Sequence, residues 1–308
     1  MSHITHVQFR QHLPPGVKRI IAYGGGCWIG EVDETTVLKY PHMAEDLKRV
    51  RIEAKILNVL GSHTRIVQSK GLTEDGFLLE FAPKGDVQEY LTANPDVPFE
   101  QRLSWCAQAA EAVAYIHSER VLHCDIRHHN LLLDAALDLR LADFQGQHFS
   151  PAGEVLLDAL SLESSKAYLP RRPIDHASVR TDLFALGSAL HFLVAGSEVF
   201  PDLHHAADED EIQRRFREGA FPNDPHVAAA VTAKCWRQRY ASARDVLADL
   251  EALWDVVRRG ERPESLGLVV SASDADAPPP AATWLSGICE GDQLPDAPPP
   301  YRQLVGFD

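Results

Sequence analysis

The chain has few cysteines, and their arrangement excludes two kinds of stabilised domain. Five cysteines occur among 308 residues, and no two of them form a Cys-x-x-Cys pair. An odd number of scattered thiols predicts neither a disulfide framework nor a zinc site built from cysteine pairs. We therefore expect reduced thiols in a cytoplasmic protein, with the nucleus as an open alternative. The cysteines are Cys27, Cys106, Cys124, Cys235 and Cys289.

Basic charge and long apolar runs are also scarce. Thirty Lys and Arg residues stand against 44 Asp and Glu, which gives a formal net charge of -14. This excess argues against broad binding to nucleic acid or to an anionic membrane, and we expect neither partner. The longest apolar run, at 183–196, is interrupted by Ser188 and His191. It is too short to span a bilayer and predicts a buried helix. The first residues do not resemble a signal peptide.

The remaining composition is typical of a folded globular protein, at 45% hydrophobic residues. After an N-terminal extension at 1–17, residues 18–81 alternate apolar runs of strand length with glycine-containing turns. Residues 82–261 carry mostly helical patterns. We predict an α+β fold with a small β-rich N-terminal lobe and a larger helical C-terminal lobe. The predicted strands are 19–23, 35–40, 65–67, 77–81, 121–122, 131–133 and 139–141. The predicted helices are 44–60, 99–118, 180–196, 210–218, 225–235 and 242–260.

The composition changes again near the C-terminal end of the sequence. Residues 262–308 contain two triple-proline runs, at 278–280 and 298–300, among Ser, Asp and Gly. This composition predicts an extended, disordered tail. A partner that recognises proline motifs is one interpretation of the two runs, and a plain linker is the favoured one.

The most informative segment reads HCDIRHHN at 123–130 and continues to ADF at 142–144. Phosphoryl transfer needs a carboxylate that orients the attacking hydroxyl and accepts its proton, and an amide and a second carboxylate that hold magnesium ions. Asp125 is therefore the candidate catalytic base, and Asn130 and Asp143 are the candidate metal ligands. A polar turn between strands is the alternative. The double match in register, with apolar residues on both sides, disfavours it.

This spacing resembles the catalytic loop and metal-binding segment of eukaryotic-type protein kinases. The resemblance extends over about 18–258. It implies a two-lobed protein kinase-like fold with an antiparallel N-lobe sheet, ATP and Mg2+ as cofactors, and a protein substrate. In VLK at 37–39, Lys39 resembles the lysine that grips the ATP phosphates, and Glu53 is the candidate that pairs with it, with Glu45 as a rival. Taken singly, each would be interpreted as a surface residue.

The resemblance also implies an ATP-binding surface in the N-lobe. The segment YGGGCWIG at 23–30 contains Gly24, Gly25 and Gly26, whose backbone can approach phosphates closely. It does not follow the regular G-x-G-x-x-G pattern, so its register stays open and a glycine-rich hairpin without a ligand is the alternative. The other residues that the resemblance assigns to adenine binding are Ile29, Val37, Leu132, and Glu80 and Ala82 in the hinge.

Several positions depart from the family pattern. Cys124 replaces the arginine that normally receives a phosphate on the activation loop, so we expect activity independent of that phosphate. Gln145 replaces a glycine and is less free in its backbone angles. Arg171 replaces the glutamate of the Ala-Pro-Glu motif. Arg127 stands where serine/threonine kinases carry a lysine, keeps the positive charge, and favours serine/threonine specificity.

Three functions are compatible with these residues. An active protein kinase is the leading one, because all five polar groups that the chemistry requires are present. A pseudokinase that binds nucleotide or partners without catalysis is the second, on the strength of the irregular glycine segment and of Cys124 and Gln145. A small-molecule phosphotransferase is the third, and the kinase-like segments at 168–171 and 182–187 disfavour it.

A zinc site is a separate interpretation of the histidines and the cysteine around Asp125. Zinc requires ligands that point to one centre in a closed shell. The resemblance instead implies that His123 packs inward against the hydrophobic interior. The four side chains concerned are those of His123, Cys124, His128 and His129.

Overall fold

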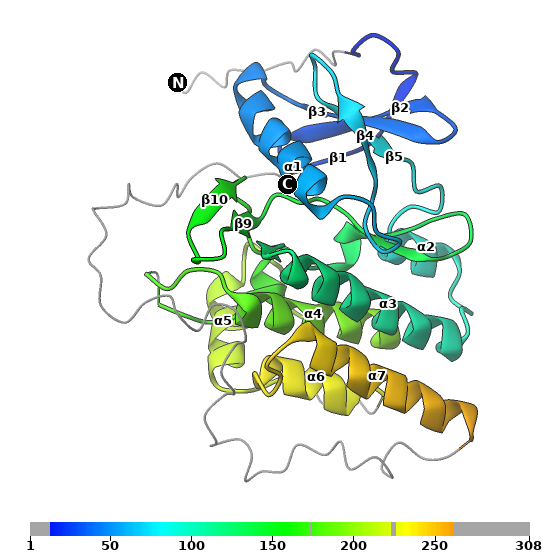
Figure 1. The fold of residues 1–308 in the computed structure, drawn as a ribbon. Coiled ribbons are helices and arrows are strands. Elements are labelled where there is room, and N and C mark those ends of the chain that lie inside the picture. Colours follow the sequence, from blue (N-terminus) through cyan, green and yellow to red (C-terminus); the bar gives the residue numbers. More distant parts are fainter. Residues whose placement is uncertain (1–12, 173, 223–225, 261–308) are drawn as a thin grey trace, which may run out of the picture.

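The computed structural model describes residues 13–172, 174–222 and 226–260. Strands and one long helix form the first part of the chain, and the second part is mainly helical (Figure 1). This arrangement confirms the predicted α+β, two-lobed architecture. The boundaries at 81 and 261 remain predictions, and the tail predicted at 262–308 lies outside the described residues.

The N-lobe is built on a five-stranded antiparallel sheet in the order β1-β2-β3-β5-β4. Helix α1 (Leu47–Leu60) packs against β3, β4 and β5, and a short 3-10 turn, η1 (Ala44–Asp46), leads into it. The central strand β3 is buried almost throughout, β5 alternates between buried and partly buried residues, and β1 is mostly exposed. The strands are β1 (Arg19–Gly24), β2 (Cys27–Asp33), β3 (Thr36–Pro41), β4 (Ser69–Leu72) and β5 (Phe77–Glu80).

The strand predicted at 65–67 was wrong. Ile66 makes a single bridge to Leu141, and β4 begins only at Ser69. The N–H of Leu141 donates to the carbonyl of Arg65 at 2.8 Å, and the N–H of Val67 donates to the carbonyl of Leu141 at 3.0 Å. The apolar run therefore signals burial against the C-lobe rather than membership of the N-lobe sheet.

The C-lobe helices agree with most of the predicted ranges. Four of them start and end within two residues of the prediction, whereas the helix predicted at 225–235 begins at Ala229 and α2 was not predicted. Helix α3 packs against both α7 and α4, and the three helices lie together in the C-lobe (Figure 1). The helices are α2 (Val87–Ala93), α3 (Phe99–Ser118), α4 (Val179–Ala195), α5 (Glu209–Arg217), α6 (Ala229–Trp236) and α7 (Ala243–Arg258).

Short strands and 3-10 turns connect α3 to α4. The strands β6 (Val121–Leu122), β7 (Leu131–Leu133) and β8 (Leu139–Leu141) were predicted. The sequence did not predict two further strands, because both are short and the first of them also pairs with the distant β6. They are β9 (Gln147–Phe149) and β10 (Val155–Asp158), and the 3-10 turns are η2 (His128–Asn130) and η3 (Ser165–Ala167).

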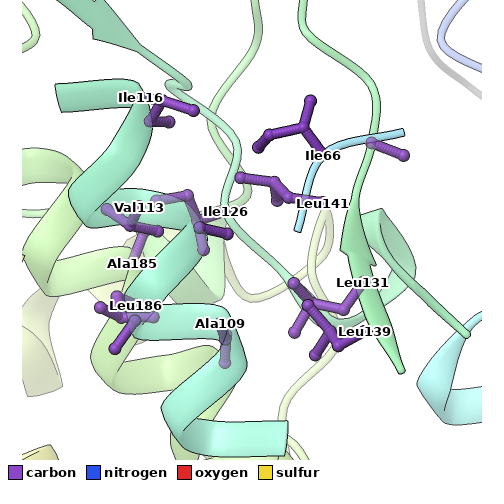
Figure 2. Close-up of a cluster of buried hydrophobic side chains, with 14 of the residues drawn as sticks. Ile66, Ala109, Val113, Ile116, Ile126, Leu131, Leu139, Leu141, Ala185 and Leu186 are labelled. Atoms are coloured by element: carbon purple, nitrogen blue, oxygen red, sulfur yellow. The ribbon is translucent and has the colours of Figure 1, made fainter. Parts of the chain in front are cut away.

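A continuous apolar core supports the polar loop between β6 and β7. Ile126, at the centre of that loop, is fully buried among side chains of α3, α4 and the β7–β8 hairpin (Figure 2). The apolar run at 183–196 lies in α4, most of which is buried. No helix among the described residues is both long and apolar enough to cross a membrane. The side chains labelled in Figure 2 are Ile66, Ala109, Val113, Ile116, Ile126, Leu131, Leu139, Leu141, Ala185 and Leu186.

Candidate active site at the junction of the lobes

The β7–β8 hairpin brings the two predicted metal ligands to the same place. Leu131 of β7 pairs with Leu141 of β8, so Asn130 and Asp143 lie at the same end of the hairpin, just outside it. Asn130 also closes the loop that carries Asp125. Its Nδ2 donates to the Asp125 carbonyl oxygen at 2.7 Å and to Asp125 Oδ2 at 3.1 Å. The structure thus gathers three residues that the sequence places up to eighteen positions apart.

Asp125 is held by one of its oxygens and leaves the other without a partner. Arg127 Nε lies 3.1 Å from Asp125 Oδ2, the oxygen that also accepts from Asn130. Oδ1 is buried and has no hydrogen-bond partner among the described residues. Burial raises the pKa of Asp125 to about 7, although the Arg127 guanidinium acts in the opposite direction. The carboxylate can therefore gain or lose a proton near neutral pH.

Lys39 links the N-lobe to Asp143, the candidate metal ligand. Its Nζ lies 2.6 Å from Glu53 Oε2 in α1 and also donates to Asp143 Oδ1. Glu53, rather than the alternative Glu45, is the partner, because Glu45 lies exposed in η1. Lys39 is 5% exposed and Glu53 is 1% exposed. The ion pair is therefore screened from water and depends on its geometry.

The charges of this cluster follow from burial and mutual attraction. Burial opposes the charge on Lys39, but Asp143 and Glu53 more than offset it and raise the Lys39 pKa. Burial also opposes ionisation of Asp143, but the Lys39 ammonium outweighs it and lowers the Asp143 pKa. Burial raises the pKa of Glu53 to about 7 against the pull of Lys39. Lys39 is thus a fixed cation between two carboxylates, and Asp143 is ionised at neutral pH.

Asp182 in α4 fixes the backbone of the loop that carries Asp125. Its two carboxylate oxygens accept the backbone N–H groups of His123 and Cys124, each at 2.9 Å. His117 Nε2 lies 2.9 Å from the same carboxylate. The carboxylate replaces the solvent that these buried N–H groups would otherwise need.

His123 uses both ring nitrogens within the protein. Nδ1 accepts the backbone N–H of Asp125 at 3.2 Å, and Nε2 lies 2.9 Å from the Ala142 carbonyl oxygen, to which it donates. Burial lowers the pKa of His123, so the ring is neutral. Its centroid lies 5.1 Å from that of Phe144. His123 therefore packs inward, and within the described residues no cluster of three or more His, Cys, Asp or Glu side chains supports a zinc site.

Three of the residues assigned to nucleotide binding share one face of the N-lobe sheet. Ile29 on β2 pairs directly with Lys39 on β3, and Val37 lies two residues before Lys39. Directly paired residues, and residues two apart on a strand, point to the same face. Ala82 is buried just after β5, whereas Glu80 and Leu132 are partly buried. The pairing selects the register in which Ile29 lies on the Lys39 side of the sheet.

The geometry of the β1–β2 hairpin by itself accounts for two of the three glycines at 24–26. Gly24 pairs with Cys27, which leaves Gly25 and Gly26 as a two-residue turn between β1 and β2. Their φ angles are 55° and 82°. A two-residue hairpin turn with both φ angles positive is a type I′ turn, which strongly favours glycine. The hairpin accounts for Gly25 and Gly26, while Gly24 keeps an ordinary strand conformation.

A small pocket lies beside Arg127. Arg127, Ser164, Lys166 and Glu198 are among its lining residues. Lys166 Nζ lies 3.0 Å from Glu198 Oε2, and His205 Nε2 lies 2.9 Å from Glu198 Oε1. Burial opposes ionisation of Glu198, but His205 and Lys166 bring its pKa down to about 2. The pocket therefore contains an ion pair next to Arg127.

Arg49 is a residue of this site that the sequence did not predict. It lies in α1 one turn before Glu53, so the two side chains share a helix face. Arg49 Nη2 lies 3.4 Å from Gln145 Oε1. The spacing of four residues before Glu53 was the signal that could have identified it.

Comparison with known protein families shows to which family the chain with this site belongs. The family model described as "Protein kinase domain" matches residues 35–252. The chain belongs to the protein kinase family. The predicted resemblance is thereby confirmed, together with the fold class, and a protein kinase domain uses ATP and a divalent metal ion.

Individual relatives in this family are modestly similar. The chain is 27% identical over 236 residues to the serine/threonine-protein kinase PrkC of Bacillus subtilis (strain 168), covering 72% of this chain and 36% of that protein. It is 27% identical over 230 residues to the maternal embryonic leucine zipper kinase of Danio rerio, covering 72% and 33%. It is 28% identical over 184 residues to the serine/threonine-protein kinase SIK1 of Rattus norvegicus, covering 58% and 23%. The chain thus spans about a third or less of the length of these relatives.

The candidate metal ligands fit a divalent cation that binds through oxygen. Asn130 uses its Nδ2 on Asp125, so its Oδ1 is the atom left to act as a ligand. Asp143 is held ionised by Lys39. A carboxylate and an amide oxygen are the donor types that magnesium prefers.

Proposed function

We propose that the chain is an active serine/threonine protein kinase, which transfers the γ-phosphoryl group of ATP to a protein hydroxyl with Mg2+ as the metal ion. The observation that supports this best is the carboxylate of Asp125. One oxygen is fixed by Asn130 and Arg127, and the other is buried without a partner among the described residues. A buried acceptor with a free lone pair is the group that an incoming hydroxyl needs.

Asp125 would orient the acceptor hydroxyl and take up its proton as the oxygen attacks phosphorus. Its pKa of about 7 suits a general base that works near neutral pH. Arg127 provides a positive charge beside it, which favours the ionised form of the carboxylate and can bind a phosphate oxygen through two N–H groups.

Asn130 and Asp143 would hold the metal, and Lys39 would hold the ATP phosphates. When bound, Mg2+ would neutralise the charge that develops on the phosphate oxygens. Glu53 keeps Lys39 in place through their buried ion pair. Lys39 contacts Asp143 directly, so the phosphate-binding cation and the metal-binding carboxylate are positioned as one unit.

The adenine ring would lie against the face of the sheet that carries Lys39. Val37 and Ile29 provide apolar surface from above, and Leu132 on β7 provides it from below. The backbone at Glu80 and Ala82 would offer hydrogen bonds to the ring edge. The backbone N–H groups at 24–26 would approach the phosphates.

Serine/threonine specificity rests on two observations. Arg127 occupies the position two residues after the catalytic aspartate, where a basic residue is expected in that class. The relatives named above carry the words serine/threonine-protein kinase in two of three cases.

A nucleotide-binding pseudokinase is the second candidate, and one contact favours it. Gln145 donates from Nε2 to Asp143 Oδ1 at 3.0 Å and so competes with a metal for that oxygen. Lys39 contacts the same oxygen. A metal ion must therefore bind through the remaining oxygen or displace the amide.

The test compares wild-type protein with Asp125→Asn in the presence of labelled ATP, Mg2+ and a mixture of basic and acidic protein substrates. Asp96→Asn is the matched control, because Asp96 is exposed after α2. We expect transfer to Ser or Thr in the wild type and in the control. In Asp125→Asn it should fall by about a factor of 100 or more.

The other outcomes distinguish the alternatives. Metal-dependent ATP binding without transfer in any variant would establish the pseudokinase instead. Transfer to a metabolite in the absence of protein would establish the small-molecule phosphotransferase. Label found on tyrosine alone would contradict the serine/threonine assignment.

A further inference from the structure

Arg49 joins α1 to the chain that follows β10. Its Nε donates to the carbonyl oxygen of Ala159 at 3.1 Å, and its Nη2 donates to that of Leu160 at 3.1 Å. The same Nη2 lies 3.4 Å from the side-chain oxygen of Gln145. The Arg49 guanidinium thus contacts two segments of the chain after Asp143: Gln145, two residues later, and the backbone at Ala159 and Leu160. All three acceptors are neutral, so Arg49 is bound here without a phosphate group.

Gln145 continues this connection in two further directions. Its Nε2 donates to Asp143 Oδ1 at 3.0 Å. The same amide lies against the glycine turn, since a Cβ placed on Gly25 would be 3.4 Å from Gln145 Nε2. A glycine at position 145 could make none of these side-chain contacts. Gln145 therefore links Arg49, the metal-binding carboxylate and the tip of the β1–β2 hairpin.

The backbone at Leu160 gives independent support, because it is held in an unfavourable conformation. Leu160 has a φ of 58° and its side chain is 65% exposed. A non-glycine residue in this region costs about 1–3 kcal/mol and persists only when its surroundings hold it. Packing of an exposed side chain does not do so. The N–H of Leu160 donates to Asp158 Oδ1 at 2.8 Å, and its carbonyl accepts from Arg49.

We propose that Arg49 and Gln145 are positioning residues that hold α1, the segment after β10 and Asp143 in the arrangement needed for catalysis, without phosphorylation of the chain. Arg49 acts through α1, where Glu53 follows one turn later and fixes Lys39. Gln145 acts through the Asp143 carboxylate. The proposal rests on the proposed function in one respect, namely that Asp143 holds the metal ion.

The residue at position 124 agrees with an arrangement that needs no phosphate group. A neutral, buried side chain stands where the family resemblance expected a phosphate-binding arginine. Arg49 instead binds backbone carbonyls and a side-chain amide, groups that are always present. Docking of a phosphate is therefore not needed to connect α1 with the segment that follows Asp143.

Hydrogen exchange tests the connection itself, without any need for activity. The variants are Arg49→Ala and Gln145→Met, the latter because methionine keeps the shape of glutamine and removes both hydrogen bonds. Arg51→Ala is the matched control, since Arg51 is an exposed arginine of the same helix. We expect faster exchange at 155–162 in Arg49→Ala and at 23–27 in Gln145→Met, and none of these changes in Arg51→Ala. Unchanged exchange in both variants would overturn the proposal.

Kinetics tests the positioning role. Each variant should lower kcat by about 10-fold to 100-fold, while KM for the protein substrate changes less than about 2-fold. The double variant should be no worse than the poorer single one, because the two residues act as one unit. Full activity in both, or losses that multiply, would contradict this. A wild-type protein that transfers no phosphate would refute the proposed function alone, because hydrogen exchange would still test the pair.

Discussion

Asp182 and Cys124 lie 58 residues apart and are joined by a hydrogen bond of 2.9 Å from the Cys124 N–H to the buried Asp182 carboxylate. The φ angle of Cys124 is 63°, in the left-handed region that residues other than glycine rarely adopt. Helix α4 therefore holds a strained peptide directly before Asp125. The orientation of the candidate base depends on a carboxylate in the C-lobe core.

Replacing Asp182 by alanine should destabilise the protein and disorder the loop. The change leaves the N–H groups of His123 and Cys124 buried without acceptors, and it removes the partner of His117. We expect a loss of about 2–5 kcal/mol in the free energy of unfolding, measured by urea denaturation. Asp96→Ala, at an exposed position, should change it by less than about 0.5 kcal/mol. An equally small loss for Asp182→Ala would contradict this account of the loop.

The rate of phosphoryl transfer should rise with pH through about 7 in the free enzyme. Asp125 must be deprotonated to act as a base, and burial raises its pKa to about 7 while Arg127 opposes that rise. Arg127→Gln removes the opposing charge, so the pKa should rise further and the acidic limb of the kcat/KM profile should move to higher pH by about 1 unit. Arg127→Lys keeps the charge and should leave the limb nearly in place. A limb that Arg127→Gln does not move would argue that another group controls it.

The same raised pKa predicts a pH-dependent difference in stability. An aspartate with a folded pKa of about 7 and an ordinary value of 3.8 keeps its proton in the folded state while the unfolded chain has lost it. Its contribution to stability therefore falls as pH rises between those values. Asparagine has no such dependence, so Asp125→Asn should gain stability relative to the wild type between pH 4 and pH 7. Parallel unfolding free energies of the two proteins across that range would show that the pKa is not raised.

Substitution by alanine should affect stability differently at two adjacent glycines of the β1–β2 hairpin. Gly25 has a φ of 55°, and a Cβ there would meet the Gln145 amide at 3.4 Å, whereas nothing lies within 4 Å of a Cβ at Gly24. Gly25→Ala should therefore cost about 1 kcal/mol and lower the melting temperature by about 2–4 °C. It should also raise KM for ATP. Gly24→Ala is the control and should leave the melting temperature unchanged or slightly higher, as thermal unfolding would show.

Arg171 and Glu163 should behave as a coupled pair. Their side chains form an ion pair and are only 15% and 14% exposed. Burial raises the pKa of Glu163 against the pull of Arg171. Glu163→Leu or Arg171→Met alone leaves a poorly solvated charge and should cost about 1–3 kcal/mol, whereas the double variant should cost less than the sum. A double-mutant cycle by urea denaturation measures the coupling, and additive losses would show that the pair is not coupled.

The part of the candidate site whose residues lie close together in the sequence was largely predictable. Asp125, Asn130 and Asp143 belong to a loop and one hairpin, so their distances along the chain almost dictate their meeting. Glu53 needed more, because Glu45 was a rival candidate in the sequence. Only the packing of α1 on β3 shows which carboxylate reaches Lys39.

Other features depended on contacts that sequence patterns do not encode. Residues 65–67 have the composition of a strand, yet their hydrogen bonds run to Leu141 in the other lobe. The partner of Arg171 became evident only in the structure, because Glu163 is one of many acidic residues nearby in the sequence. The register of the glycine segment likewise required the pairing of Ile29 with Lys39.

The sequence by itself determined the family, the α+β architecture and the identity of the polar residues around Asp125, because periodicity and short-range spacing are properties of the chain alone. The tertiary structure decided which of these residues form ion pairs and hydrogen bonds with one another, and how burial shifts their pKa values. Burial raised the pKa of Asp125 to about 7 and left one of its oxygens without a partner among the described residues. Folding also brought the side chains of Arg49 and Gln145 together, although they are 96 residues apart in the sequence. Desolvation and long-range contact act only once the chain has folded, and for that reason no local pattern could show them.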